Sequence, residues 1–294
     1  MKSLIATQMR GIVLLLVLSI FLPGCAWLDV QQRQAIYRPS LAAAPNLEGL
    51  RPQDLRYFLD IPQAQLANGS AQRIEMWWLP HPDPNAPTLL YCHGTFRNLD
   101  QNLPKINALR EAGFAILAVE YRGWGLSSPI TPSEQTIMQD AQLALEELLK
   151  REPRPLQRVL YGHSMGSGVA VDLASRLTDP LQIGGVILES AFTSFKDVAI
   201  QVGWLGRLLA KFNRERFASI DKIKNVKAPL LMLHGQLDTT VQARLGNTLY
   251  KAANEPKRWV LLDNGKHSDL QEVHALEYQA ALRQFMQQHF ASKN

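Results

Sequence analysis

One serine in the chain stands in a setting that could make it a nucleophile. Ser164 is the centre of the run Gly-His-Ser-Met-Gly at residues 162–166, which directly follows the apolar run 158–161. Where a strand turns into a helix, this pattern holds the hydroxyl in a strained conformation at the edge of a sheet. The two glycines let the strand and the helix approach without side-chain clashes. The sequence therefore predicts that Ser164 is a catalytic nucleophile.

An acid and a base that could activate this serine lie further along the chain. A serine hydroxyl is a weak nucleophile at neutral pH, so it needs a base, and the base needs an acid that orients it. Asp238 and His267 each come shortly after an apolar run of strand length, in the order serine, acid, histidine that this kind of turn requires. We therefore expect Asp238 to be the acid and His267 the base. Glu189 also ends such a run and remains the alternative acid.

Attack by a serine on an acyl group creates an oxyanion, which needs two preorganised N–H donors. One is expected from Met165, the residue after the nucleophile. The other is expected from Thr95, in the loop after the apolar run 88–92, with Phe96 as the alternative. Cys92 could compete as a nucleophile, but no histidine is in register with it, and a buried apolar role is favoured.

These residues need a scaffold, and the apolar pattern indicates one. Eight runs of strand length occur at residues 56–61, 73–79, 88–92, 114–119, 158–161, 185–188, 229–233 and 258–262. Helical periodicity separates most of the later runs, at about residues 102–112, 133–150, 165–177, 241–253 and 270–290. This alternation predicts the α/β class, with a mostly parallel central sheet flanked by helices. The first two runs, separated by Asn68-Gly69, are expected to form an antiparallel hairpin.

The pattern of predicted strands and helices indicates that residues 53–294 form one domain. Residues 192–226 contain no strand-like run, and we expect them to form a short helical cap. The apolar residues of this segment could line an acyl pocket or only seal the cap onto the body; they are Val202, Trp204, Leu205, Leu208, Leu209 and Phe212.

Composition excludes several other classes of protein. The chain has 294 residues, a formal charge of +5 and two cysteines, which rules out a disordered chain, a coiled coil and a disulfide scaffold. No basic run interleaves with aromatic residues, so no nucleic-acid partner is expected. His93, His163 and His234 match no metal-binding spacing, and each is expected to orient a loop by hydrogen bonding. We expect no cofactor and no metal.

The N-terminal residues read as a targeting signal. Lys2 and Arg10 precede an apolar run at residues 11–22, which is shorter than the roughly 20 residues that a membrane span needs. The run ends in Leu-Pro-Gly-Cys, which resembles a bacterial lipobox with Cys25 as the acylated residue. We therefore expect residues 1–24 to be a lipoprotein signal peptide. Residues 25–52 have no clear period, and they are expected to form a tether.

By resemblance to Gram-negative lipoproteins, Ala26 rather than aspartate after Cys25 implies anchoring by lipid in the outer membrane, facing the periplasm. The envelope membrane is then a partner, through the N-terminal lipid alone.

Several motifs together resemble the α/β-hydrolases of the serine aminopeptidase-like and monoacylglycerol lipase-like group. The motifs lie at residues 91–94, 121–125, 162–166, 234–238 and 265–267. The run at residues 189–194 and the short cap look most like the depalmitoylases and lysophospholipid lipases of that group. The resemblance implies hydrolysis of ester, thioester or amide bonds without a metal or an organic cofactor. Glu120 and Gln242 depart from the group, which usually has aspartate and often proline at these positions.

These observations favour a serine hydrolase that cleaves a carboxylic ester or thioester of a small-molecule or lipid acyl substrate through an acyl-enzyme. Two alternatives remain, a peptidase or amidase of the serine aminopeptidase type and a non-catalytic binding lipoprotein. The basic excess in residues 192–226 disfavours a pocket for a substrate amine and mildly favours anionic substrates; it consists of Lys196, Arg207, Lys211, Arg214 and Arg216 against Asp197 and Glu215.

Overall fold

The structure is a computed structural model that describes residues 27–290, except 43, 45–47, 67–68, 180 and 211–212. It divides into two compact units, one ending at Arg38 and the other beginning at Pro39. The expected signal peptide, residues 1–24, and the expected acylation site, Cys25, lie outside the described residues.

The described part of the first unit is a helix over residues 27–37. The sequence predicts a tether over residues 25–52, and the helix over residues 27–37 lies within it. Glutamine, arginine and alanine favour helices, and Asp29 and Arg33 form an ion pair one turn apart. The helix ends before Pro39, since proline disfavours helical backbone in the residue before it. No helix in the described part of the chain is long and apolar enough to cross a membrane.

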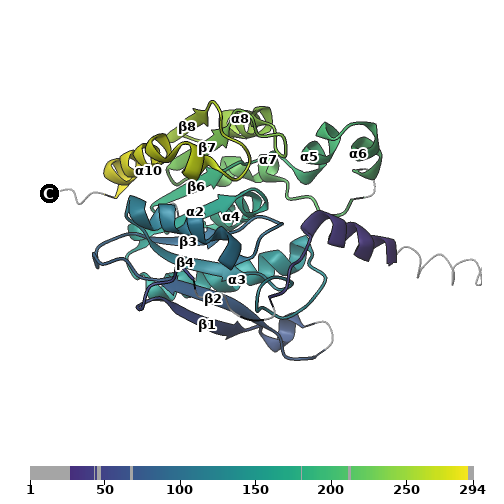
Figure 1. The fold of residues 1–294 in the computed structure, drawn as a ribbon, viewed down its shortest axis with the longest axis horizontal. Coiled ribbons are helices and arrows are strands. Elements are labelled where there is room, and N and C mark those ends of the chain that lie inside the picture. The colour runs from purple at the N-terminus through teal and green to yellow at the C-terminus, as the bar shows by residue number, and fades with distance from the viewer. Residues whose placement is uncertain are drawn as a thin grey trace, which may run out of the picture. The chain divides into compact units, whose positions relative to one another are not determined.

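The second unit is built around one sheet (Figure 1). Its strands are β1 Leu55–Asp60, β2 Arg73–Leu79, β3 Thr88–Cys92, β4 Ala115–Glu120, β5 Arg158–His163, β6 Gly185–Glu189, β7 Leu230–Gly235 and β8 Lys257–Leu262. They lie side by side in the order β1-β2-β4-β3-β5-β6-β7-β8. β2 pairs antiparallel with β1 and β4, and every other neighbouring pair is parallel. The predicted mostly parallel sheet is confirmed.

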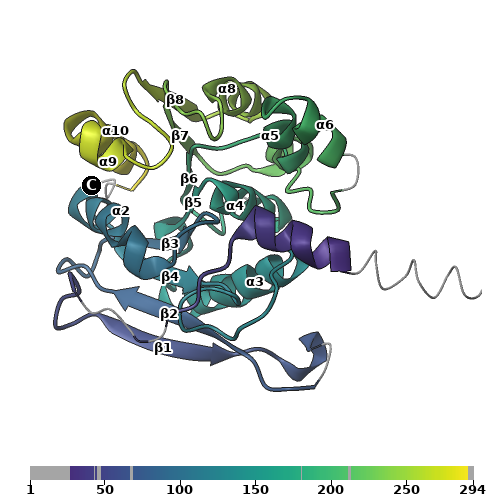
Figure 2. The same ribbon diagram turned by 45° about the vertical axis from the view of Figure 1, so that its right-hand side comes forward.

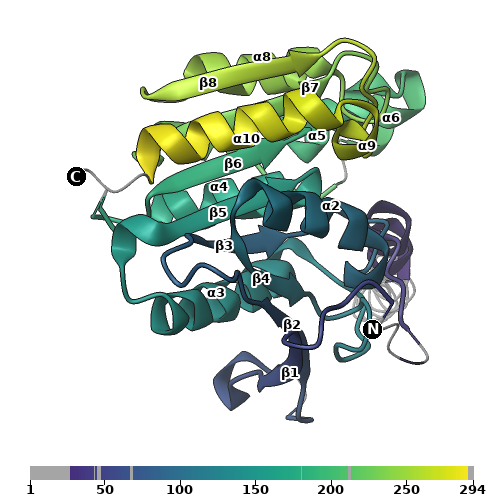
Figure 3. The same cartoon turned by 60° about the vertical axis from the view of Figure 1, so that its left-hand side comes forward.

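Helices cover both faces of this sheet (Figures 2 and 3). One face carries α2 Leu99–Ala112, α9 Leu270–Val273 and α10 Ala275–His289, and the other carries α3 Glu134–Arg151, α4 Met165–Arg176 and α8 Ala243–Ala252. Every residue of β3, β4, β5 and β6 is buried, as expected for strands covered on both sides. The candidate residues lie in loops at the carboxyl ends of β3, β5, β7 and β8.

Capping residues explain where two of the helices begin. Asn98 accepts a hydrogen bond from the Gln101 N–H, so α2 starts at Leu99, earlier than the apolar pattern predicted. Ser133 caps α3 in the same way, in agreement with the start expected there. The helix expected over residues 270–290 is divided at His274 into α9 and α10.

The first two strands pair antiparallel, as predicted, but no tight turn joins them. The connection between Asp60 and Arg73 contains a 3-10 turn, η1 Gln63–Gln65. Asn68, expected in the turn, lies outside the described residues.

The segment between β6 and β7 consists mainly of short helices. They are α5 Phe195–Gln201, α6 Trp204–Leu209, α7 Ser219–Lys222 and the 3-10 turn η3 Ile223–Asn225. Val202 and Trp204 are each 77% exposed and Leu208 is 46% exposed, so these three side chains do not seal the segment onto the body. The side chains of Leu205, Leu209 and Phe212 lie outside the description.

Candidate active site

Ser164 occupies a sharp turn between β5 and α4. Its φ of 53° is rare for a residue with a side chain, and such a conformation costs about 1–3 kcal/mol. The backbone packs so closely around this turn that the two flanking positions have no room for a side chain, and both are glycines. A Cβ on Gly162 would lie 2.1 Å from the Gly166 carbonyl oxygen, and one on Gly166 would lie 2.0 Å from the Cys92 carbonyl oxygen. The Gly-x-Ser-x-Gly pattern is therefore a steric requirement of this turn.

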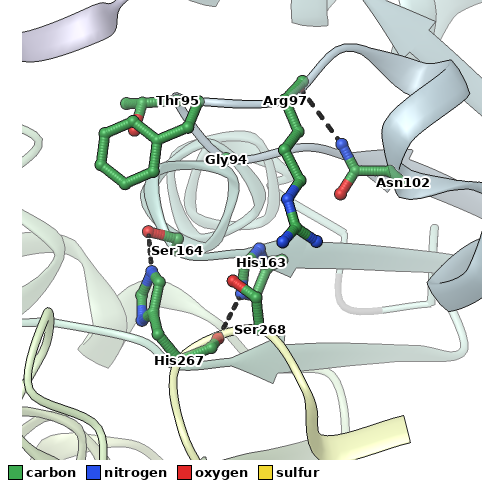
Figure 4. A pocket seen from close by; sticks show the side chains of 9 residues that line it. Gly94, Thr95, Arg97, Asn102, His163, Ser164, His267 and Ser268 are labelled. Atoms are coloured by element: carbon green, nitrogen blue, oxygen red, sulfur yellow. Dashed lines mark hydrogen bonds between the residues drawn. The ribbon is translucent and has the colours of Figure 1, made fainter. Parts of the chain in front are cut away.

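The structure brings Ser164, His267 and Asp238 together in one hydrogen-bonded chain. Ser164 Oγ lies 2.9 Å from His267 Nε2 (Figure 4), and His267 Nδ1 lies 2.7 Å from Asp238 Oδ2. The three residues come from the turns after β5, β8 and β7. An ionised Asp238 accepts a hydrogen bond from Nδ1–H, so the proton stays on Nδ1 and Nε2 is left free to accept a proton from the serine hydroxyl.

The Asp238 carboxylate is held by its own loop. Its Oδ1 accepts hydrogen bonds from the N–H groups of Thr240 and Val241, at 2.9 Å and 2.8 Å. Burial opposes ionisation, but the neighbouring imidazoles of His234 and His267 and the Val241 N–H outweigh it. They hold the pKa of Asp238 well below its ordinary value. This carboxyl group is therefore an anion at neutral pH.

Glu189, the alternative acid, has other partners. Its carboxylate accepts hydrogen bonds from Tyr161 Oη at 2.6 Å and Tyr278 Oη at 2.9 Å, and it forms an ion pair with Lys105. Burial raises its pKa, but Lys105 outweighs this effect and keeps the pKa of Glu189 below its ordinary value. Lys105 also donates to Gln271 Oε1 at 2.6 Å. Glu189 thus braces the helices beneath the site, and the described structure records no contact between it and His267.

Two backbone N–H groups beside Ser164 are available to an oxyanion. Those of Thr95 and Met165 have no hydrogen-bond partner among the described residues. The loop around Thr95 is rigid because its carbonyls are engaged. His93 Nδ1 lies 2.6 Å from the Gly94 oxygen, and Trp124 Nε1 donates to the Thr95 oxygen at 2.7 Å. The assignment of these donors to an oxyanion hole stays a prediction.

The three histidines next to the motifs each hydrogen-bond a loop, as expected. His93 contacts Gly94, and His234 Nε2 lies 2.8 Å from the Val241 oxygen, in the Asp238 loop. His163 Nε2 lies 2.8 Å from the backbone oxygen of His267 itself.

The direct contact of His163 with the His267 carbonyl was not foreseen, although its place beside Ser164 was a signal. Ser190 Oγ reaches the same carbonyl at 3.2 Å, so the His267 backbone is held from two sides.

Nine residues line the pocket around Ser164, namely Gly94, Thr95, Phe96, Arg97, Asn102, His163, Ser164, His267 and Ser268. Sequence reasoning missed Arg97 and Asn102, at the start of α2, and Ser268, in the loop after β8. No described residue of the segment 192–226 lines this pocket. Its volume of about 20 Å³ is the space of about one water molecule.

Cys92 lies next to the site but is chemically shielded. It is fully buried, and burial raises the pKa of its thiol to about 12. The described residues contain no group of three or more histidine, cysteine or carboxylate side chains that could hold a metal ion.

Comparisons with known proteins identify the family. The sequence model of the family described as serine aminopeptidase, S33, matches residues 83–222. An uncharacterised protein of Mycobacterium tuberculosis is 31% identical over 259 residues, which are 87% of each chain. The lysophosphatidylserine lipase ABHD12 of Danio rerio is 32% identical over 212 residues, 67% of this chain and 55% of that protein. The chain belongs to the α/β-hydrolase superfamily.

Solved structures agree with this hydrolase fold. An esterase of Pyrococcus furiosus has a TM-score of 0.66 at 17% identity, over 86% of this hydrolase and 97% of that chain. The acylaminoacyl peptidase of Pyrococcus horikoshii has a TM-score of 0.60 at 16% identity, over 82% of this hydrolase and 42% of that chain. At such identities the likeness concerns the fold alone.

The two departures of this hydrolase from its group have structural explanations. Glu120 is buried, its Oε2 accepts the Leu99 N–H at 2.8 Å, and its Oε1 lies 3.1 Å from His93 Nε2. The longer carboxylate thus holds the start of α2. Gln242 donates its backbone N–H to Gln201 Oε1 of α5 at 3.0 Å. A proline at position 242 has no N–H and would lose this link to the helical segment.

Proposed function

We propose that this hydrolase cleaves a carboxylic ester or thioester through an acyl-enzyme formed on Ser164. The observation that carries the proposal is the hydrogen-bonded chain from Ser164 Oγ through His267 to Asp238, at 2.9 Å and 2.7 Å. The lipase named among the relatives supports ester chemistry.

The proposed reaction has two halves. His267 Nε2 takes the Ser164 proton while Oγ adds to the acyl carbonyl, and the N–H groups of Met165 and Thr95 stabilise the oxyanion. The alcohol or thiol leaves with the proton from His267. A water molecule, deprotonated in turn by His267, then releases the acid and restores the serine.

A peptidase or amidase of the serine aminopeptidase type is the second candidate, because the matching family carries that description. An aminopeptidase has to bind the protonated amine at the N-terminus of its substrate. No carboxylate is among the described residues that line the pocket, and Arg97 contributes a positive charge. This charge balance favours esters over peptides with a free amine.

Labelling with a fluorophosphonate tests the proposal. We expect the reagent to modify Ser164, and Ser164→Ala to lower kcat on 4-nitrophenyl butyrate by about 10⁶-fold without loss of folding. Ser268→Ala is the matched control, because it removes another hydroxyl of the pocket and should leave the labelling in place. Turnover by Ser164→Ala at the rate of the unchanged protein would exclude the mechanism. Absence of both labelling and hydrolysis would instead favour a non-catalytic binding protein.

We also propose that Cys25 carries the lipid that anchors this enzyme in the bacterial cell envelope, with the catalytic domain in the periplasm. The support is the apolar run at residues 11–22 and the Leu-Pro-Gly-Cys sequence at its end.

A further inference from the structure

The side chain of one cationic residue of the pocket, Arg97, takes part in none of the hydrogen bonds or ion pairs described above. Arg97 lies in the turn between Thr95 and the first residue of α2, and it is exposed. Figure 4 shows its side chain extending from this turn toward His163 and Ser268, which line the same pocket as Ser164. Its guanidinium therefore reaches the region that a bound ester would occupy.

The backbone of Arg97 is fixed, whereas its guanidinium is free. Asn102 Nδ2 donates to the Arg97 carbonyl oxygen at 3.2 Å and to the Asn98 carbonyl oxygen at 2.8 Å. Asn102 Oδ1 in turn accepts from Tyr91 Oη at 3.2 Å. The Arg97 guanidinium forms no hydrogen bond and no ion pair with any described residue. Its donors are thus all unused, on a side chain whose backbone is held in place.

Two buried arginines of the same fold are paired. Arg110 bonds both oxygens of Asp54, at 2.8 Å and 3.0 Å. Arg122 bonds Asp140 at 2.7 Å through Nε and at 2.8 Å through its backbone N–H. These two arginines link separate segments of the fold, whereas the Arg97 guanidinium links no described segments.

No carboxylate lines the pocket beside Arg97, and the anionic Asp238 behind His267 is engaged by His267 and by the N–H groups of its own loop. None of the nine lining residues is an aspartate or a glutamate. Burial and the nearby Lys105 lower the pKa of His163 to about 3, so this imidazole is neutral. The charge of Lys105 is balanced by Glu189. A positive pocket of this kind attracts anions, and a guanidinium matches the geometry of a carboxylate or a phosphate.

We infer that Arg97 binds an anionic group, a carboxylate or a phosphate, that the substrate carries near its scissile ester. The substrates of this enzyme are then anionic esters, selected by charge at the pocket. This inference rests on the proposed ester hydrolysis by Ser164, and it adds the residue that selects among esters.

Two matched pairs of esters test the inference. The first pair is 4-nitrophenyl butyrate and mono(4-nitrophenyl) glutarate, which places a carboxylate on the acyl side. The second pair is 1-butyrylglycerol and 1-butyrylglycerol 3-phosphate, which places a phosphate on the alcohol side. We expect the unchanged enzyme to have a higher kcat/KM for the anionic member of at least one pair. The pair that shows this preference tells whether Arg97 binds an anionic group on the acyl side or on the alcohol side of the ester.

Variants of Arg97 separate charge recognition from catalysis. We expect Arg97→Gln to reduce the ratio of kcat/KM for the anionic ester to that for the neutral ester by about 10- to 100-fold, the range of a charged hydrogen bond. Arg97→Lys should keep part of the preference, and added salt should weaken the preference of the unchanged enzyme. Arg283→Gln is the control, because it removes the same charge from an exposed position of α10 that does not line the pocket.

The outcomes distinguish this inference from the proposed function. Hydrolysis of the neutral esters with no anionic preference, or an equal ratio in Arg97→Gln, would overturn the role of Arg97 and leave the ester hydrolase standing. Failure to hydrolyse any of the four esters, together with no fluorophosphonate labelling of Ser164, would overturn both.

Discussion

At the residue scale, two buried carboxylates compete for the role of catalytic acid. Glu189 ends β6 and Asp238 follows β7, so both lie near the edge of the sheet that carries Ser164. The partners of the two groups separate them. Asp238 accepts from His267, whereas Glu189 is enclosed by Lys105, Tyr161 and Tyr278. The sequence could name both candidates but could not choose, because the choice depends on contacts between residues far apart in the chain.

Substitution of each carboxylate by its amide should have a different result. We expect Asp238→Asn to lower kcat about 10⁴-fold with little change in Tm, because the amide no longer sets the imidazole tautomer. Glu189→Gln should instead lower the free energy of unfolding by about 3–5 kcal/mol, since it leaves Lys105 buried without a counter-charge. Ester hydrolysis and thermal unfolding of both variants measure the two effects. Near-normal turnover by Asp238→Asn would remove Asp238 from the mechanism.

The rest of the pocket shows the limit of residue-level prediction. Ser164, Asp238 and His267 could be predicted because each follows a strand signal directly. Arg97 gave no such signal, since an arginine in a polar turn is ordinary until the fold brings His163 and Ser268 beside it.

At the element scale, the loop after β8 has to be held against the end of β5 for His267 to reach Ser164. His163, the last residue of β5, provides this link through its hydrogen bond to the His267 carbonyl. The alternation of strands and helices could be predicted, since buried parallel strands and amphipathic helices have distinct apolar patterns. The helix over residues 27–37 could not, because its sequence has no clear apolar period.

The link through His163 makes the stability depend on pH. The imidazole titrates near pH 6.5 in an unfolded chain, whereas burial and Lys105 lower its pKa to about 3 in the folded protein. Between these values the unfolded chain binds one proton more, so the free energy of unfolding falls as the pH falls. We expect His163 alone to account for a loss of about 2 kcal/mol between pH 6.5 and pH 5.

Urea unfolding at the two pH values, with His163→Asn as the comparison, measures this contribution. The variant should be less stable at pH 6.5, because it loses the hydrogen bond, but its stability should change less with pH. Other titrating groups are common to both proteins and cancel in the difference. Equal pH dependence of the two proteins would show that His163 does not titrate in this way.

At the scale of the whole molecule, the chain combines a hydrolase domain with a proposed N-terminal targeting signal. Removal of residues 1–24 takes away Lys2 and Arg10 and no acidic residue, so 29 basic and 26 acidic residues remain and the charge falls from +5 to +3. Part of the basic excess therefore lies in the proposed signal peptide, outside the hydrolase domain. Lipid attachment at Cys25 would hold the domain at a bilayer by its acyl chains, at about 0.8 kcal/mol for each buried CH₂ group.

Cys25→Ser tests the proposed anchor. We expect this variant to move from the membrane fraction to the soluble periplasmic fraction and to incorporate no radiolabelled palmitate. Cys92→Ala removes the other cysteine and should leave the fractionation unchanged. If Cys25→Ser stays with the membrane and still takes up label, the lipid is attached elsewhere; if it stays with the membrane without label, the apolar run itself is the anchor.

The spacing of the site along the chain has a consequence for the time at which it forms. Ser164 and His267 are 103 residues apart, and His267 follows β8, the last strand along the chain. A nascent chain synthesised only as far as β7 holds the proposed nucleophile but lacks its proposed base. We therefore expect the proposed site to be complete only after β8 and the loop that follows it have been synthesised and have folded.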